Sequence, residues 1–177
     1  MRKILLFAVV LLCFAALAAA QKDKSQRPSP PAQAQCKFPD GKTITVDYSS
    51  PRAKGRKIFG GLVPYGEIWR TGANEATTFV TDADLTVGKV TVPARGYTIF
   101  TIPNPDKWTL IINKKTGEWG IPYKYEADEL GRVDMKVSAT SGPVENFTIA
   151  FDQSSNACRL NLSWENTQAS VEFVEKR

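Results

Sequence analysis

The chain has 177 residues, of which 42% are hydrophobic, and 23 basic against 18 acidic side chains give it a formal charge of +5. It contains no histidine, which excludes a Ser-His-Asp triad and every histidine-based metal site. Acidic and basic residues alternate through most of the chain, so its charge does not favour nucleic acid as a partner, and we expect neither a metal site nor a cofactor.

Residues 1–20 have the pattern of a secretory signal peptide. Arg2 and Lys3 precede an apolar run, and the run ends in small residues up to Ala20, where we expect cleavage. The run is short for a bilayer span, and no later segment is apolar enough to cross a membrane. We therefore predict a mature chain without a transmembrane segment, located in the periplasm or outside the cell.

The next segment, residues 21–35, is polar, carries three prolines and lacks apolar periodicity. These features are typical of a disordered spacer. We therefore expect a single folded domain over residues 36–177, which is long enough to bury a substantial core.

Within this domain the apolar residues recur with period two, which predicts β-strands. Residues 43–48 alternate apolar and polar side chains after a Pro-Asp-Gly turn, and residues 85–87 and 89–92 flank Gly88. Further β-branched and aromatic runs, separated by turn residues, lie at 97–102, 108–113, 133–138, 147–152, 158–164 and 169–174. Many short strands without a long amphipathic helix predict an all-β fold, an antiparallel β-sandwich, with a jelly roll as the favoured variant.

Cleavage of the signal peptide would remove Cys13 and leave Cys36 and Cys158, near the two ends of the predicted domain. An even pair in an oxidising compartment suits a single bridge, so we predict a Cys36–Cys158 disulfide. The alternative is two separate buried thiols. Two cysteines without histidine do not supply the four ligands of a structural zinc site.

The most irregular part of the chain is residues 48–77, called here the loop segment. It mixes charges, aromatics, glycines and prolines without helical or strand periodicity. Binding groups are commonly mounted on shaped loops of this kind. Its cations and its polar and aromatic groups are our candidate ligand-binding residues: Arg52, Lys54, Arg56, Trp69, Arg70, Asn74 and Glu75.

Two readings of these residues stay open. The cations near Arg56 are either a solvated loop or an anion-binding patch. Gly72 permits a tight turn that would pair Arg70 with Glu75. That pair would be either a structural clasp or part of a polar pocket in which Arg70 holds an anionic or hydroxylated ligand.

An enzymatic reading is weaker. Glu67 and Glu75 are the acids that a paired-carboxylate glycosidase would use, and such an enzyme needs two acids that flank a cleft. Three of the four tryptophans are expected in the core. Trp119 is the exception, because it lies in a stretch with glycines, a proline and two tyrosines that would present ring faces to a carbohydrate.

The loop segment and the residues after it resemble a bacterial exported family known as domain of unknown function 2911. The signature lies in residues 49–60, 62–66 and 69–76, the last of which reads WRTGANEA, and the resemblance continues through residues 92–94, 97–103, 108–113 and 119–120. One departure is a glycine displaced by one position, at Gly96. The resemblance implies an exported β domain and carries no established activity.

We therefore predict a non-catalytic, extracytoplasmic β-sandwich module that binds a small polar, anionic or carbohydrate ligand. A structural or protein-interaction domain of the cell envelope is the first alternative, and a carboxylate-dependent glycan hydrolase is the second. The expected partner is an unknown small ligand or an envelope component.

Overall fold

The computed structural model describes residues 24–176. The predicted signal peptide and its cleavage point after Ala20 lie outside these residues. The described residues form nine strands and two short 3-10 helices, which confirms the all-β fold class. Among them, no helix has the length and the apolarity that crossing a membrane requires.

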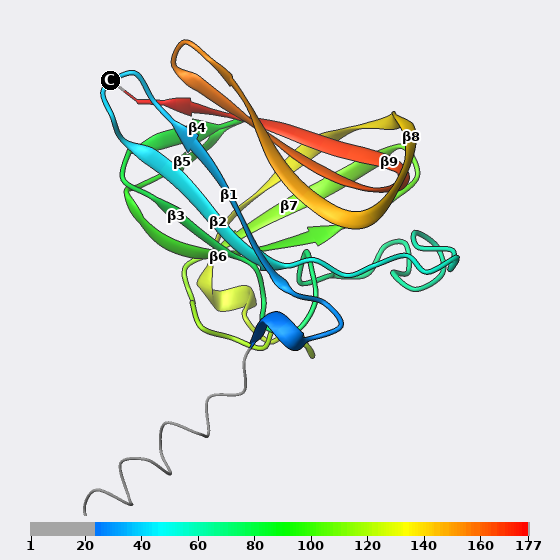
Figure 1. Ribbon diagram of the computed structural model, residues 1–177. Coiled ribbons are helices and arrows are strands. Elements are labelled where there is room, and N and C mark those ends of the chain that lie inside the picture. The colour runs from blue at the N-terminus through cyan, green and yellow to red at the C-terminus, as the bar shows by residue number, and fades with distance from the viewer. Residues whose placement is uncertain (1–23, 177) are drawn as a thin grey trace, which may run out of the picture.

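The strands form one continuous antiparallel sheet in the order β1-β2-β3-β6-β7-β8-β9-β4-β5 (Figure 1). In chain order they are β1 (Pro31–Lys37), β2 (Thr43–Ser49), β3 (Thr78–Thr81), β4 (Leu85–Val87), β5 (Val90–Val92), β6 (Arg95–Ile102), β7 (Lys107–Asn113), β8 (Glu129–Ser154) and β9 (Ala157–Glu175). The helices are η1 (Lys24–Gln26) and η2 (Glu126–Asp128).

The last two strands are longer than the periodicity predicted. The turn residues Ser141, Gly142 and Pro143, which separate the predicted runs 133–138 and 147–152, do not end the strand, because β8 and β9 pair with each other on both sides of this position. They lie in a register irregularity between Ala139 and Val144 instead. The four short strands expected after residue 132 therefore merge into one long hairpin.

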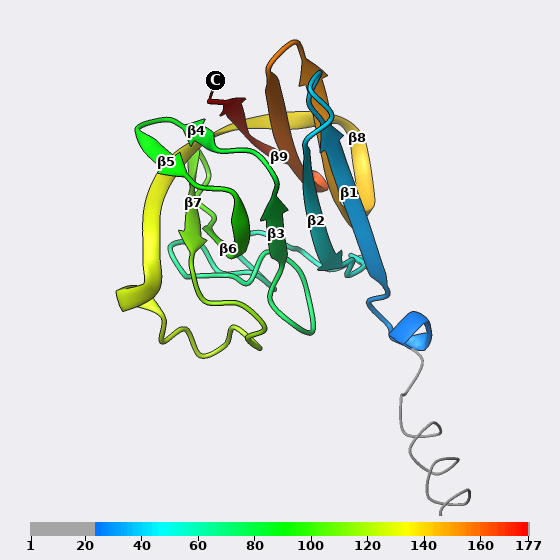
Figure 2. The same ribbon diagram turned by 90° about the vertical axis from the view of Figure 1, so that its left-hand side faces the viewer.

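This hairpin lets the sheet fold over itself. Phe79 of β3 and Phe173 of β9 are far apart in the strand order, yet their ring centroids are 4.9 Å apart. Figure 2 shows β8 running from beside β7 over the top of the molecule to the side of β1. All nine strands contribute buried side chains to one main core between the two halves of the folded sheet, and Phe100 of β6 and Ile111 of β7 form a second, smaller cluster with Ala76. A sandwich is compatible with this packing, but the hydrogen-bonded ladder is one sheet rather than the two of a jelly roll.

The predicted Cys36–Cys158 disulfide is present and joins the two halves. Cys36 lies on β1, Cys158 lies at the start of β9, and their Cα atoms are 6.2 Å apart. Both residues are buried.

The predicted disordered spacer, residues 21–35, is wrong over its described part, 24–35. β1 begins at Pro31 and pairs along its whole length with β2. The segment looked unstructured because β1 is an edge strand whose outward residues are polar: Gln33 donates to Asp47 at 2.7 Å, and Gln35 donates to Thr45 at 3.2 Å. A proline is also tolerated at the first position of an edge strand.

The long loops gather at one end of the sheet. Figure 1 shows the connection from β7 to η2 and the residues around η1 below the strands, and the connection from β2 to β3 leaves the same lower end and extends to the right. The connection from β2 to β3 contains most of the loop segment. The residues proposed from sequence as a binding site are thus mounted at a single end of the fold.

Candidate functional site

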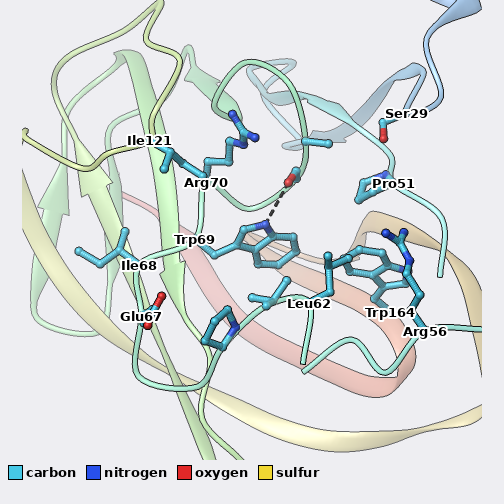
Figure 3. A pocket seen from close by; sticks show the side chains of 14 residues that line it. Ser29, Pro51, Arg56, Leu62, Glu67, Ile68, Trp69, Arg70, Ile121 and Trp164 are labelled. Atoms are coloured by element: carbon cyan, nitrogen blue, oxygen red, sulfur yellow. Dashed lines mark hydrogen bonds between the residues drawn. The ribbon is translucent and has the colours of Figure 1, made fainter. Parts of the chain in front are cut away.

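A pocket with a volume of about 400 Å³ opens among these loops (Figure 3). We call it the arginine pocket. It is lined by Ser29, Pro51, Arg56, Leu62, Val63, Pro64, Glu67, Ile68, Trp69, Arg70, Gly72, Ala73, Ile121 and Trp164.

Arg70 is a fixed cation in the wall of this pocket. Its Nη1 donates to the backbone oxygen of Asn74 at 2.5 Å and to that of Trp119 at 3.3 Å. Its guanidinium carbon lies 5.0 Å from the centroid of the Trp119 ring, at a distance that suits a cation–π contact. Desolvation lowers the pKa of Arg70, with Glu75 acting in the opposite direction, but a guanidinium remains charged in proteins.

The approach of Trp119 to Arg70 depends on Gly120. Gly120 has φ +91°, and a Cβ at this position would lie 2.9 Å from the Cβ of Ala76 and 3.2 Å from that of Arg70. Glycine is therefore required here both by the backbone conformation and by the space. It lets residues 114–125 close against the loop segment, which brings Ile121 to the pocket.

Arg56 supplies the second cation. Its Nε donates to the backbone oxygen of Ala53 at 3.0 Å and its Nη2 to that of Arg52 at 2.6 Å, so the side chain is held against its own loop. Among the described residues, no carboxylate forms a salt bridge with either Arg56 or Arg70. Neither pocket arginine therefore forms a salt bridge, although the Glu75 carboxylate acts on the charge of Arg70 from a greater distance.

The floor of the pocket is aromatic, and Trp69 belongs to it as a core residue. Trp69 is 8% exposed, and its Nε1 donates to the backbone oxygen of Gly72 at 2.9 Å, as Figure 3 shows. It stacks on Trp164 with centroids 5.9 Å apart. Trp108 and Trp164 are also buried, whereas Trp119 is 54% exposed. The predicted contrast between Trp119 and the other tryptophans is confirmed.

Asn74 and Glu75 face the N-terminal residues instead of the arginine pocket. Asn74 Nδ2 donates to the backbone oxygen of Ser29 at 3.0 Å. Glu75 forms salt bridges with Arg27 at 2.7 Å and Lys24 at 3.4 Å. Together they hold residues 24–30, called here the N-terminal strap, against the domain.

The predicted Arg70–Glu75 pair is therefore wrong. Hydrogen bonds from Arg27, and to a smaller extent from Lys24, lower the pKa of Glu75 to about 2. The sequence alone gives no sign of this pairing, because Arg27 and Lys24 lie in the segment whose composition predicts a spacer.

Arg52 and Lys54 do not line the arginine pocket either. Arg52 Nη1 donates to Asn146 Oδ1 at 3.0 Å, and the backbone N–H of Lys54 donates to Glu145 Oε1 at 2.9 Å. Both contacts hold residues 52–54 against β8. Of the seven candidates, Arg56, Trp69 and Arg70 share the pocket, and the other four do not.

Sequence reasoning missed the apolar part of the pocket. Leu62 and Ile121 are 48% and 49% exposed, and both line it. Leu62 carried a usable signal, since it is a large apolar residue among cations and glycines. Ile121 and Ser29 carried none, because they reach the pocket only through the tertiary fold.

The two acids named from the sequence, Glu67 and Glu75, do not flank one cleft. Glu67 is exposed, and no second acid lines the arginine pocket. Glu75 lines a separate cavity of about 290 Å³ together with Asp47 and Glu118. Its pKa of about 2 keeps Glu75 ionised, whereas a general acid requires a raised pKa.

Comparison with known proteins yields one match. A family model described as "Protein of unknown function (DUF2911)" matches residues 29–173. No curated protein and no solved structure matches the chain. The matched region includes the whole arginine pocket and eight complete strands, from β1 to β8.

Proposed function

Because the chain belongs to the DUF2911 family, whose description assigns no activity, its own site has to indicate a function, and we propose that it is an extracytoplasmic, non-catalytic binding module. Its arginine pocket holds a small anionic ligand with an apolar body. One observation carries this proposal: two arginines that form no salt bridge among the described residues flank a cavity of about 400 Å³ with apolar walls, and the single acid that lines this cavity, Glu67, is exposed.

The composition of the pocket supports this ligand class. Small-molecule sites are mostly apolar, with a few placed polar groups, and have volumes of about 300–1,000 Å³. Leu62, Ile68 and Ile121 supply apolar walls, and a ligand body would cover Leu62 and Ile121, which are half exposed. Arginine binds carboxylates and phosphates through charge-assisted hydrogen bonds.

A carbohydrate is less favoured. The ring that sequence analysis offered as a sugar platform, Trp119, already has the guanidinium of Arg70 against it. The location outside the cytoplasm rests on the sequence pattern of residues 1–20, and the Cys36–Cys158 disulfide supports it because such bridges persist in oxidising compartments.

A thermal-shift screen of residues 21–177 tests the proposal, with the strap kept because it contributes to the pocket wall. The panel contains sugars, nucleotides, inorganic phosphate, and carboxylates with aliphatic or aromatic bodies. A ligand at about 100 times its Kd stabilises the fold by about 2.7 kcal/mol. We expect shifts from anions that carry an apolar group.

Matched arginine variants identify the site. Arg56→Gln and Arg70→Gln should abolish the shift, while Arg52→Gln, which changes a cation of the same loop outside the pocket, should retain it. Glutamine keeps a hydrogen-bond donor but loses the charge. A shift from neutral sugars, or a shift that survives both pocket variants, would contradict the proposal.

A further inference from the structure

The exposed large apolar side chains are concentrated among the loops. In the part of the chain that the structure describes, those that are more than a third exposed are Leu62, Tyr65, Val80, Trp119 and Ile121. Only Val80 lies on a strand. Leu62 and Ile121 line the same pocket, and Trp119 stacks on Arg70 of that pocket. Clustered exposed apolar groups mark an interaction surface, whereas scattered ones need no explanation.

The same loops are cationic. Residues 51–70 contain five Lys and Arg residues and a single acid, Glu67. Lys54, Arg56 and Lys57 are exposed, and none of them forms a salt bridge with a described carboxylate. In residues 114–125, Glu118 is already paired with Lys115 at 3.7 Å. The surface therefore presents unpaired positive charge beside its apolar groups.

We propose that this surface docks on a bilayer of anionic phospholipid. It consists of Leu62, Tyr65, Trp119 and Ile121 with Lys54, Arg56 and Lys57, and we call it the loop face. Trp and Tyr side chains favour the membrane–water interface, Leu and Ile side chains favour the hydrocarbon beneath it, and Lys and Arg are attracted to anionic headgroups. The binding is peripheral and does not require the arginine pocket to hold a ligand.

The mixture of groups favours a bilayer over an acidic protein. The centres of protein–protein interfaces are depleted of charged residues, lysine in particular. On the loop face, Lys57 and Leu62 are neighbours, because the backbone N–H of Leu62 donates to the oxygen of Lys57 at 3.1 Å. A fluid headgroup layer accommodates apolar and cationic side chains together without a fixed complementary shape.

Trp119 offers a direct readout. All four tryptophans lie in the described residues, and Trp69, Trp108 and Trp164 are at most 8% exposed. Insertion of the loop face should therefore shift the emission of Trp119 to shorter wavelength and expose it to quenching by brominated lipids. Trp119→Phe should remove the spectral change, which assigns the signal to this side chain.

The experiment measures co-sedimentation of residues 21–177 with two kinds of vesicle, phosphatidylcholine alone and an equimolar mixture with phosphatidylglycerol, at low and at physiological salt. We expect binding to the mixed vesicles that weakens with salt, together with the Trp119 spectral change. Each removed cation should weaken binding about five-fold, so Lys54→Gln with Lys57→Gln should weaken it by about 25-fold.

Matched variants separate the loop face from the rest of the surface. Leu62→Ser combined with Ile121→Ser should abolish binding, whereas Val80→Ser and Lys89→Gln, which alter an exposed apolar residue and an exposed cation elsewhere, should leave it unchanged. Thermal melts show that each variant is folded. No binding to the mixed vesicles, equal binding to both kinds, or binding without a change at Trp119 would overturn the proposal.

Discussion

Two tryptophans of one aromatic cluster differ in the environment of their single polar atom. Trp69 and Trp108 have centroids 6.3 Å apart, and both are buried. Trp69 Nε1 donates to the backbone oxygen of Gly72 at 2.9 Å. Trp108 Nε1 is buried, and no described residue accepts a hydrogen bond from it. A buried donor without an acceptor carries a desolvation cost, whereas a paired one does not.

Replacing each of these residues by phenylalanine should separate the two situations. Both variants remove the same ring volume and the same N–H. Trp69→Phe also leaves the Gly72 oxygen without its donor, while Trp108→Phe relieves an unpaired group, so Trp69→Phe should be more destabilising by about 1–2 kcal/mol. Urea unfolding at pH 7 gives the two free energies. Equal losses, or a larger loss for Trp108→Phe, would contradict this interpretation of the cluster.

At the scale of elements, the loop segment contributes to two separate structures, the arginine pocket and the attachment of the N-terminal strap. Its residues 56–70 build much of the arginine pocket, and its residues 74–75 hold the N-terminal strap. The strap in turn contributes Ser29 to the pocket wall, and its Pro30 accepts from the N–H of Ser50 at 2.9 Å. The motif WRTGANEA at residues 69–76 thus contributes both to the arginine pocket and to the contacts that hold the strap.

The clasp should give stability a defined pH dependence. The pKa of Glu75 is lowered from 4.5 to about 2 in the folded chain, mainly by its hydrogen bond from Arg27. Its contribution is therefore fully present above about pH 4.5 and is lost as the pH falls through about 2. The side chain is 44% exposed, so solvent screening limits the contribution to about 1 kcal/mol or less.

Glu75→Gln should accordingly lower the free energy of unfolding at pH 7 by up to about 1 kcal/mol, and the difference from the wild type should vanish near pH 2. Urea unfolding at both pH values measures this. Glu67→Gln is the control, because Glu67 is exposed and forms no salt bridge among the described residues. A difference for Glu75→Gln that stays constant with pH would disprove the charge-based clasp.

At the scale of the whole molecule, a single sheet closes over its own core. The disulfide joins β1 at one edge of that sheet to β9, across a sequence separation of 122 residues. Phe79 and Phe173 make a second contact between the two halves. The loops that carry the pocket and the loop face all lie at one end of this closed frame (Figure 1).

Removing the disulfide should cost much of the stability of the frame. The double variant Cys36→Ser, Cys158→Ser should lose about 2–5 kcal/mol, since a bridge that closes a long loop restricts the unfolded chain strongly. Urea unfolding measures the loss, and the reduced wild-type protein should show a similar one. Circular dichroism should report the same β content for the variant below its transition. A loss under about 1 kcal/mol would mean that the core alone holds the two halves together.

Local patterns predicted a good part of this architecture. Period-two alternation located most strands, because successive side chains of a strand point to opposite faces of the sheet, so burial of one face makes every second residue apolar. Both failures arise because the pairing partner of a strand cannot be recognised from the residues of that strand. The polar residues Gln33 and Gln35 predict disorder by their composition, because nothing in the residues of an edge strand shows which strand it pairs with. The turn residues around Gly142 predict a break between two strands, whereas β8 continues past them with a register shift, since a bulge and a turn use the same residues.

The amino-acid sequence by itself determined the all-β class, the Cys36–Cys158 pairing and the irregular segment that carries Arg56 and Arg70. These follow from composition and from neighbours along the chain. Only the tertiary structure decided which groups meet: Trp119 lies 49 residues from Arg70 in sequence yet accepts its hydrogen bond, and Glu75 pairs with Arg27 across 48 residues. Such contacts depend on how the sheet folds over and how its loops converge, which no local pattern records.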